Sequence, residues 1–202
     1  MRIIKLNEQS RANILADLLK RDPNNYSAYE GTVQEIVDDV RARGDEALFE
    51  YTKKFDGAEL SADNIRVTQA EIQEALSQVD PNLLAVMKKS MKNIREYHEK
   101  QKQYSWFDSK PNGTILGQKV TALSSVGVYV PGGKAAYPSS VLMNIIPAEV
   151  AGVEKIVMVT PPGKDGKVNP VTLIAAHLAG ATEVYKVGGA QAIAALAFGT
   201  KS

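Results

Sequence analysis

Residues 155–198 read KIVMVTPPGKDGKVNPVTLIAAHLAGATEVYKVGGAQAIAALAF, and this stretch decides the fold class. The run at 155–160 is short and almost continuously apolar, as expected of a strand covered on both faces. At 169–180 an Asn-Pro pair is typical of the N-cap and first position of a helix that ends at a glycine. A second strand is expected at 182–187, and the glycine pair at 188–189 leads directly into another helix. This alternation predicts a parallel sheet with helices packed on it.

The segment before this pattern continues it in the amino-terminal direction. The Asn-Gly pair at 112–113 is a strong turn signal, and residues 114–130 are partly alternating strand material. Residues 139–152 are helical in pattern, and Ser139 or the serine after it can cap that helix. Pro147 lies inside it, so we expect a kink or a break there.

The sequence before about residue 112 is charged and helix-like. Two capping boxes, Thr32 with Glu35 and Thr68 with Glu71, each predict the start of a helix. Further helix boundaries are expected at Gly44-Asp45, where Asp45 would be an N-cap, at Asp56-Gly57, and at Asp80-Pro81. The helix from Pro81 carries one narrow apolar seam, formed by Leu84, Met87, Met91 and Ile94.

Composition excludes several classes of function. The chain has 202 residues, a net charge of +1 and 44% hydrophobic residues, so neither global disorder nor a nucleic-acid partner is expected. Cysteine is absent, which excludes disulfides and a cysteine nucleophile within these residues. The first twenty residues lack an apolar signal-peptide core, and no apolar run reaches the roughly 20 residues that span a bilayer. We expect a soluble, cytoplasmic protein with no membrane partner.

Two glycine pairs, Gly132-Gly133 and Gly188-Gly189, stand between a predicted strand and a predicted helix. Glycine lets the backbone turn sharply and approach a ligand, and the following helix N-terminus offers free amide donors. Lys134 could add a positive charge for phosphate. We expect the loops 131–134 and 187–191 to meet at one edge of the sheet. The alternative is that these glycines only make tight turns.

Neither glycine pair completes a known phosphate-binding fingerprint. The motif GxGxxG is absent, and GxxxxGK[ST] fails because Gly133 occupies the lysine position after Gly127 and Gly132. A dinucleotide at these turns would therefore bind outside the standard Rossmann manner.

The two histidines are poor metal ligands. His98 continues the seam of a charged helix, and His177 lies among alanines on a predicted packing helix, so neither has a suitable ligand one turn away. No G-x-S-x-G motif supports serine hydrolase chemistry. The residues therefore give no support for a metal site or for serine hydrolase chemistry.

Three stretches resemble the histidinol dehydrogenase family. GVYVPGGKAAYPSSVLMNIIPAEVAGV at 127–153 is similar to the long signature segment of that family. VGGAQAIAALAFGT at 187–200 and GDEALFEYTKKFDG at 44–57 also resemble its members. The resemblance covers nearly the whole chain.

This resemblance implies a specific activity. Members are NAD-dependent, zinc-containing homodimers that oxidise L-histidinol through L-histidinal to L-histidine, in histidine biosynthesis. Their fold is similar to that of aldehyde dehydrogenases, with two related, incomplete Rossmann-like α/β globules. By motif, Tyr129 and Gln191 correspond to residues that contact NAD, and Ser139 corresponds to a serine near the substrate.

The resemblance also implies an α/β chain in two parts. Residues 1–125 would form a helix-rich amino-terminal region with part of the first globule, and residues 126–202 the start of the nucleotide-binding globule. The family's zinc ligands and proton-shuttling pair lie beyond the segment that matches Thr200. We therefore expect a truncated, inactive chain whose sheet has an unpaired edge, which favours self-association or marginal stability.

Two alternatives stay open from the residues. One is another aldehyde dehydrogenase-like reductase, such as a glutamyl phosphate reductase, whose catalytic cysteine is not found here. The other is a non-catalytic nucleotide-binding module.

Overall fold

A three-stranded parallel sheet forms the centre of the molecule. The computed structural model describes residue 5 and residues 7–19, 26–132 and 136–202. Strands β3 (Ser125–Tyr129), β4 (Lys155–Thr160) and β5 (Glu183–Lys186) lie side by side in that order, and both pairings are parallel. The predicted α/β class and the parallel sheet are confirmed.

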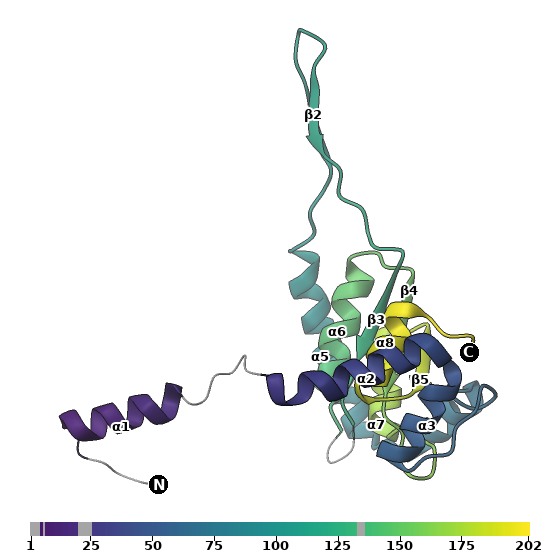
Figure 1. Ribbon diagram of the computed structural model, residues 1–202. Coiled ribbons are helices and arrows are strands. Elements are labelled where there is room, and N and C mark those ends of the chain that lie inside the picture. The colour runs from purple at the N-terminus through teal and green to yellow at the C-terminus, as the bar shows by residue number, and fades with distance from the viewer. Residues whose placement is uncertain (1–4, 6, 20–25, 133–135) are drawn as a thin grey trace.

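Helices cover both faces of this sheet (Figure 1). The bounds are α1 Glu8–Leu19, α2 Ser27–Arg43, α3 Asp45–Asp56, α4 Gln69–Gln78, α5 Pro81–Glu99, α6 Pro138–Val150, α7 Pro170–Ala179 and α8 Gly189–Phe198. Alternate strand residues point to opposite faces, because side chains alternate along a strand. Ile156 and Met158 lie in a core with α4 to α7, whereas Val159 and Val187 lie in a second core with α3 and α8. The sheet is therefore sandwiched, as the apolar run at 155–160 predicted.

Most helix boundaries follow the predicted capping signals. Thr68 and Glu71 form a complete capping box at α4, Asp80 caps α5 ahead of Pro81, and Asn169 accepts hydrogen bonds from two amides of α7. The seam of α5 is also confirmed: Met87 is buried, and Leu84, Met91 and Ile94 pack on the same core.

The capping box at Thr32 and Glu35 was a wrong prediction. Helix α2 begins at Ser27, so Thr32 lies in its second turn, and the N-cap is Tyr26. Helix extension through Gly31 costs only about 1 kcal/mol relative to alanine, which does not stop the helix. Asp45 is likewise the first helical residue of α3, and Gly44 is its N-cap.

Helix α6 differs from its prediction at two places. It is continuous from Pro138 to Val150, so the break expected at Pro147 does not occur. Ile145, Ile146 and Val150 are buried against the sheet, and this packing holds the helix despite the hydrogen bond that proline removes. Its N-cap is Tyr137 and not a serine, because Pro138 occupies the first helical position.

A β-hairpin projects away from the sheet and its helices (Figure 1). Strand β1 (Trp106–Ser109) pairs antiparallel with β2 (Ile115–Gln118), and the turn between them contains the Asn-Gly pair predicted at 112–113. The segment predicted as continuous strand material is thus divided between β2 and β3. The sequence analysis did not predict β1, because only its four residues (WFDS) pair and they show no apolar alternation.

The outer edge of β5 is protected by a segment that precedes α4. Lys186 N donates to Ile65 O at 2.9 Å, Val67 N donates to Val184 O at 2.9 Å, and Arg66 forms an antiparallel bridge with Tyr185. The edge of the sheet at β5 is therefore covered. The expected unpaired edge is found instead at β3, which has no strand on its outer side within the described residues. None of the helices in the described ranges meets the length and hydropathy that a bilayer crossing demands.

Candidate functional site

Three turns meet at the carboxyl ends of the strands. A Cβ atom on Gly132, after β3, would lie 2.8 Å from Pro161 Cγ, and one on Gly188, after β5, would lie 2.6 Å from Pro161 Cβ. Pro161 itself follows β4, so it is wedged between the two glycine turns. Only glycine leaves room for this contact. Gly133 and Lys134, which were also candidates, lie outside the described residues.

Tyr129 and the second glycine turn are in direct contact. Gly189 N donates a hydrogen bond of 3.4 Å to Tyr129 Oη, across 60 residues of sequence. The loops around 131 and 188 therefore lie at one edge of the sheet, as predicted. Open α/β sheets usually bind ligands at this edge.

Gln191 lies in the first turn of α8, directly beside that contact. Its side chain is only 1% exposed, and neither Oε1 nor Nε2 has a hydrogen-bond partner among the described residues. A Cβ on Gly189, whose φ is +65°, would lie 2.4 Å from Gln191 Oε1. A buried amide without partners is costly, so an arrangement that retains one points to a ligand that completes it.

The third predicted residue, Ser139, is exposed in the first turn of α6. That helix follows β3, so its N-terminus lies at the carboxyl-end edge that also carries Tyr129. No contact joins Ser139 to Tyr129 or Gln191 among the interactions of the described chain. We call the carboxyl-end edge of the sheet, formed by residues 129–132, Pro161 and residues 187–191, the rim. The position of Ser139 is compatible with a ligand that extends from the rim toward α6.

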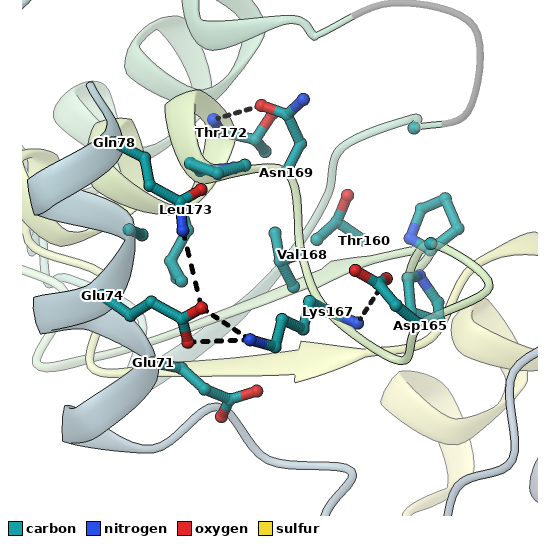
Figure 2. A pocket seen from close by; sticks show the side chains of 16 residues that line it. Glu71, Glu74, Gln78, Thr160, Asp165, Lys167, Val168, Asn169, Thr172 and Leu173 are labelled. Atoms are coloured by element: carbon teal, nitrogen blue, oxygen red, sulfur yellow. Dashed lines mark hydrogen bonds and ion pairs between the residues drawn. The ribbon is translucent and has the colours of Figure 1, made fainter. Parts of the chain in front are cut away.

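A pocket of about 370 Å³ opens beside the rim and shares Gly132 and Pro161 with it (Figure 2). Its other walls come from α4 and from the loop and first turns of α7. The polar side chains around it are Glu71, Glu74, Gln78, Thr160, Asp165, Lys167, Asn169 and Thr172. The pocket lining is thus part polar and part apolar, and it contains charges of both signs.

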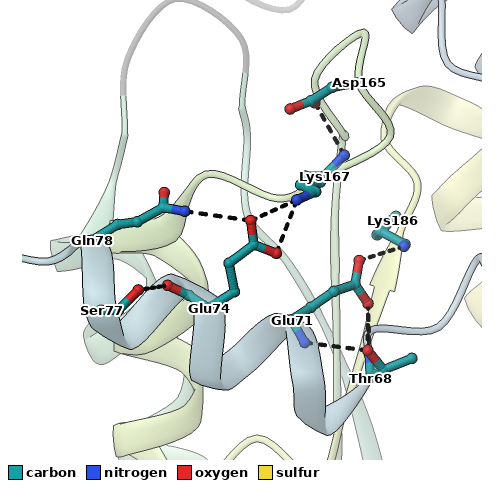
Figure 3. A network of polar contacts seen from close by, with 8 residues as sticks. All are labelled: Thr68, Glu71, Glu74, Ser77, Gln78, Asp165, Lys167 and Lys186. Atoms are coloured by element: carbon teal, nitrogen blue, oxygen red, sulfur yellow. Dashed lines mark hydrogen bonds and ion pairs between the residues drawn. The ribbon is translucent and has the colours of Figure 1, made fainter.

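Two ion pairs join the α4 wall to the rest of the site (Figure 3). Lys186 Nζ donates to Glu71 Oε1 at 2.7 Å, and Lys167 Nζ donates to Glu74 Oε1 at 2.6 Å. The first pair is largely buried, with side-chain exposures of 6% for Lys186 and 21% for Glu71. Because Lys186 directly precedes the turn 187–189, this pair fixes the end of β5 to α4.

The ion pairs shift the pKa of Glu71 and the pKa of Lys167. Burial raises the pKa of Glu71, but hydrogen bonds from Lys186 and Thr68 together lower it by more, so its pKa lies below the ordinary value of 4.5. The hydrogen bond to Glu74 raises the pKa of Lys167. Each of these two shifts favours the charged form of its group.

The sequence analysis missed both ion pairs. Glu71 was identified only as a helix cap, and its partner Lys186 is 115 residues away. No local pattern signals such a contact, because Lys186 ends a short strand (EVYK) that already carries a second charged residue, Glu183.

The close fit at Gly188 leads to a testable prediction. We expect Gly188→Ala to lower the free energy of unfolding by about 2 kcal/mol, because the rigid Pro161 ring cannot turn away from the added methyl group. Urea denaturation measures this change. The matched control is Gly31→Ala in α2, where a Cβ meets no atom within 4 Å. It should raise stability by roughly 0.5–1 kcal/mol, and equal effects of the two changes would contradict the packing argument.

Comparisons with known proteins identify the family of the chain. A family model described as histidinol dehydrogenase matches residues 19–202. The histidinol dehydrogenase of Bacillus subtilis is 60% identical over 85% of this chain, and that of Heliobacterium mobile is 57% identical over 83%. A crystal structure of histidinol dehydrogenase from Elizabethkingia anophelis matches 86% of the chain with a TM-score of 0.80 and 37% identity.

The match covers only part of each relative. It spans 40% of the Bacillus subtilis protein, 39% of the Heliobacterium mobile protein and 40% of the Elizabethkingia anophelis chain. Long matches at 57–60% identity nevertheless leave no ambiguity about ancestry, and the chain belongs to the histidinol dehydrogenase family.

Proposed function

We propose that this chain supplies the NAD-binding rim of a histidinol dehydrogenase, a cytoplasmic enzyme that oxidises L-histidinol through L-histidinal to L-histidine. The observation that carries the proposal is the Gln191 amide, buried without a partner in the first turn of α8 beside Tyr129. A bound nicotinamide dinucleotide would give this amide the hydrogen bonds it lacks. NAD, when bound, accepts the hydride removed from the substrate.

The residues of the rim have distinct tasks in this proposal. The turn at 188–189 lets the backbone approach a phosphate, and the N-terminus of α8 contributes its partial positive charge. Gln191 offers one donor and one acceptor from a fixed position, which favours a ligand with complementary groups. Tyr129 offers a ring and a hydroxyl, and Ser139 would lie toward the substrate.

The resemblance also implies zinc, which the described residues do not fit. No group of three or more His, Cys, Asp or Glu side chains able to hold a metal ion lies within the described ranges. We therefore assign no zinc-dependent step to the described residues. The remaining elements of the proposal are an aldehyde dehydrogenase-like fold, a division near residues 125/126, and a homodimeric whole enzyme.

NAD titration tests the rim. We expect saturable binding of NAD to the 202-residue chain by isothermal titration calorimetry, and Tyr129→Ala should weaken it by about tenfold, equivalent to about 1.4 kcal/mol. Tyr104→Ala is the matched control, because that tyrosine is exposed at the base of the hairpin. Unchanged NAD affinity in Tyr129→Ala would contradict the proposal.

A second test concerns turnover. The 202-residue chain with NAD and L-histidinol should form no NADH above the rate without protein, since the described residues contain neither a metal site nor an assigned acid–base pair. Absorbance at the NADH band measures this, with the full-length Bacillus subtilis relative as a positive control. Robust NADH formation by the chain itself would refute the assignment of only a cofactor-binding role.

A further inference from the structure

The tip of the projecting hairpin is a tight turn in which Asn112 precedes Gly113 (Figure 1). Gly113 N donates to Lys110 O at 3.0 Å, and Lys110 N donates to Thr114 O at 2.8 Å. Gly113 has a φ of +83°, a left-handed conformation that glycine adopts at no steric cost. Residues 110–114 are all exposed, so water has free access to the turn.

The side chain of Asn112 is folded back over this turn. Its Oδ1 accepts a hydrogen bond of 3.1 Å from Thr114 N, two residues further along the chain. An asparagine side chain that bonds its own backbone two residues on passes over the peptide unit in between. Here that unit joins Asn112 to Gly113. The side-chain carbonyl carbon, Cγ, therefore lies on the same side of the turn as Gly113 N.

Three features of this arrangement favour attack of Gly113 N on Asn112 Cγ. The reaction closes a five-membered ring within one chain, so no second molecule has to be positioned. Thr114 N–H already donates to the carbonyl oxygen on which negative charge develops during the attack. Gly113 has no side chain to hinder the approach. Apart from its chain neighbours, the space within 4 Å of the position that its Cβ would take is empty.

We propose that Asn112 is a site of spontaneous deamidation. Gly113 N gives up its proton to hydroxide, releases Lys110 O and forms a bond to Asn112 Cγ. The bond between Cγ and the side-chain nitrogen breaks, and that nitrogen takes a proton from water and leaves as ammonia. Water then opens the cyclic imide at either of its carbonyl carbons. One product is aspartate, and the other is isoaspartate, in which the main chain runs through Cβ and Cγ.

The two products change the hairpin in different ways. Both place a negative charge at the tip. Isoaspartate also lengthens the main chain by one carbon atom, which disturbs the neighbouring pair Ser109 and Ile115, whose register the turn sets. The pair Trp106 and Gln118, at the other end of the ladder, should keep its register. The reaction involves no residue of the rim, so it does not depend on NAD binding.

Incubation of the 202-residue chain in mildly alkaline buffer, followed by peptide mass spectrometry, tests the proposal. Deamidation raises the mass of a peptide by about 1 Da. Labelling by an isoaspartate-specific methyltransferase identifies the isoaspartate product. Asn64 is the internal control, because it is also exposed and in a turn, but is followed by the β-branched and buried Ile65. Asn112 should react at least about tenfold faster than Asn64, and its rate should rise with pH.

Two variants separate the chemistry from a general loss of order at the tip. Asn112→Gln keeps a side-chain amide but would have to close a larger ring, so modification there should be at least about tenfold slower. Asn112→Asp carries the charge without the longer main chain. Amide exchange at Lys110 N, which donates to Thr114 O, should be at least about tenfold faster in the isoaspartate form than in Asn112→Asp. Equal rates at Asn112 and Asn64, an undiminished rate in Asn112→Gln, or aspartate as the only product would each overturn the proposal.

Discussion

Replacing Gln191 with methionine is expected to stabilise the protein and at the same time to abolish most NAD binding. The side chains have similar length and helix propensity, but methionine has no amide to leave unsatisfied. A buried polar group without a partner costs about 1–3 kcal/mol, so Gln191→Met should raise the free energy of unfolding by roughly 1–2 kcal/mol. The affinity for NAD should fall by about tenfold or more, since the ligand loses its buried hydrogen-bonding partner.

Urea denaturation and calorimetric NAD titration measure the two effects on the same samples. Gln73→Met is the matched control, because Gln73 is an exposed glutamine in the helix α4. It should change stability by less than about 0.5 kcal/mol and leave NAD affinity unaltered. If Gln191→Met raises the free energy of unfolding and weakens NAD binding, the Gln191 amide is retained for a ligand and not for stability. A Gln191→Met protein that is less stable would show that the amide has a structural role.

Breaking the buried ion pair of α4 and β5 is expected to have the largest effect on stability. Glu71→Gln keeps the size of the side chain and its place in the capping box, but leaves the Lys186 ammonium buried without a counter-charge. We expect a loss of about 3 kcal/mol, because an uncompensated buried charge is costly. Glu74→Gln on the same helix is the matched control. Its partner Lys167 is half-exposed, so the loss should be at most about 1 kcal/mol.

The pH dependence separates the two variants further. The pKa of Glu71 is lowered in the folded state, so its contribution to stability is present above the ordinary value of 4.5 and is lost as the pH falls through the lower, folded-state value. Between these two values, the wild-type chain should lose stability faster than Glu71→Gln on acidification. Urea denaturation at a series of pH values measures both curves. Parallel curves would show that Glu71 does not titrate with folding.

The helices and strands were predictable where the signal is local. A capping box, an Asp-Pro pair or an Asn-Pro pair acts within three or four residues, and Thr68, Asp80 and Asn169 accordingly begin α4, α5 and α7. Thr32 and Glu35 have the same residue types and spacing as Thr68 and Glu71, but Thr32 lies inside α2. The residue types of Thr32 and Glu35 do not show whether the preceding turn is already helical. A capping box forms only where that turn is not helical.

The candidate site was partly predictable. Glycine pairs between strands and helices pointed to the carboxyl-end edge, and the likeness to the family pointed to Tyr129 and Gln191. The hydrogen bond between Gly189 N and Tyr129 Oη supports the expected meeting of the two loops. The Pro161 wedge and the unsatisfied state of the Gln191 amide were not predictable, because each depends on neighbours from other elements.

The sequence by itself determined the alternation of strands and helices, most helix starts and the family of the protein, since these depend on near neighbours or on long runs of matching residues. Only the tertiary structure decided that Ile65 to Val67 pair with β5, that Lys186 meets Glu71, and that β3 keeps an open edge. The physical reason is that such contacts join residues tens to more than a hundred positions apart. Their geometry is set by the packing of helices on both faces of the sheet, which no local pattern encodes.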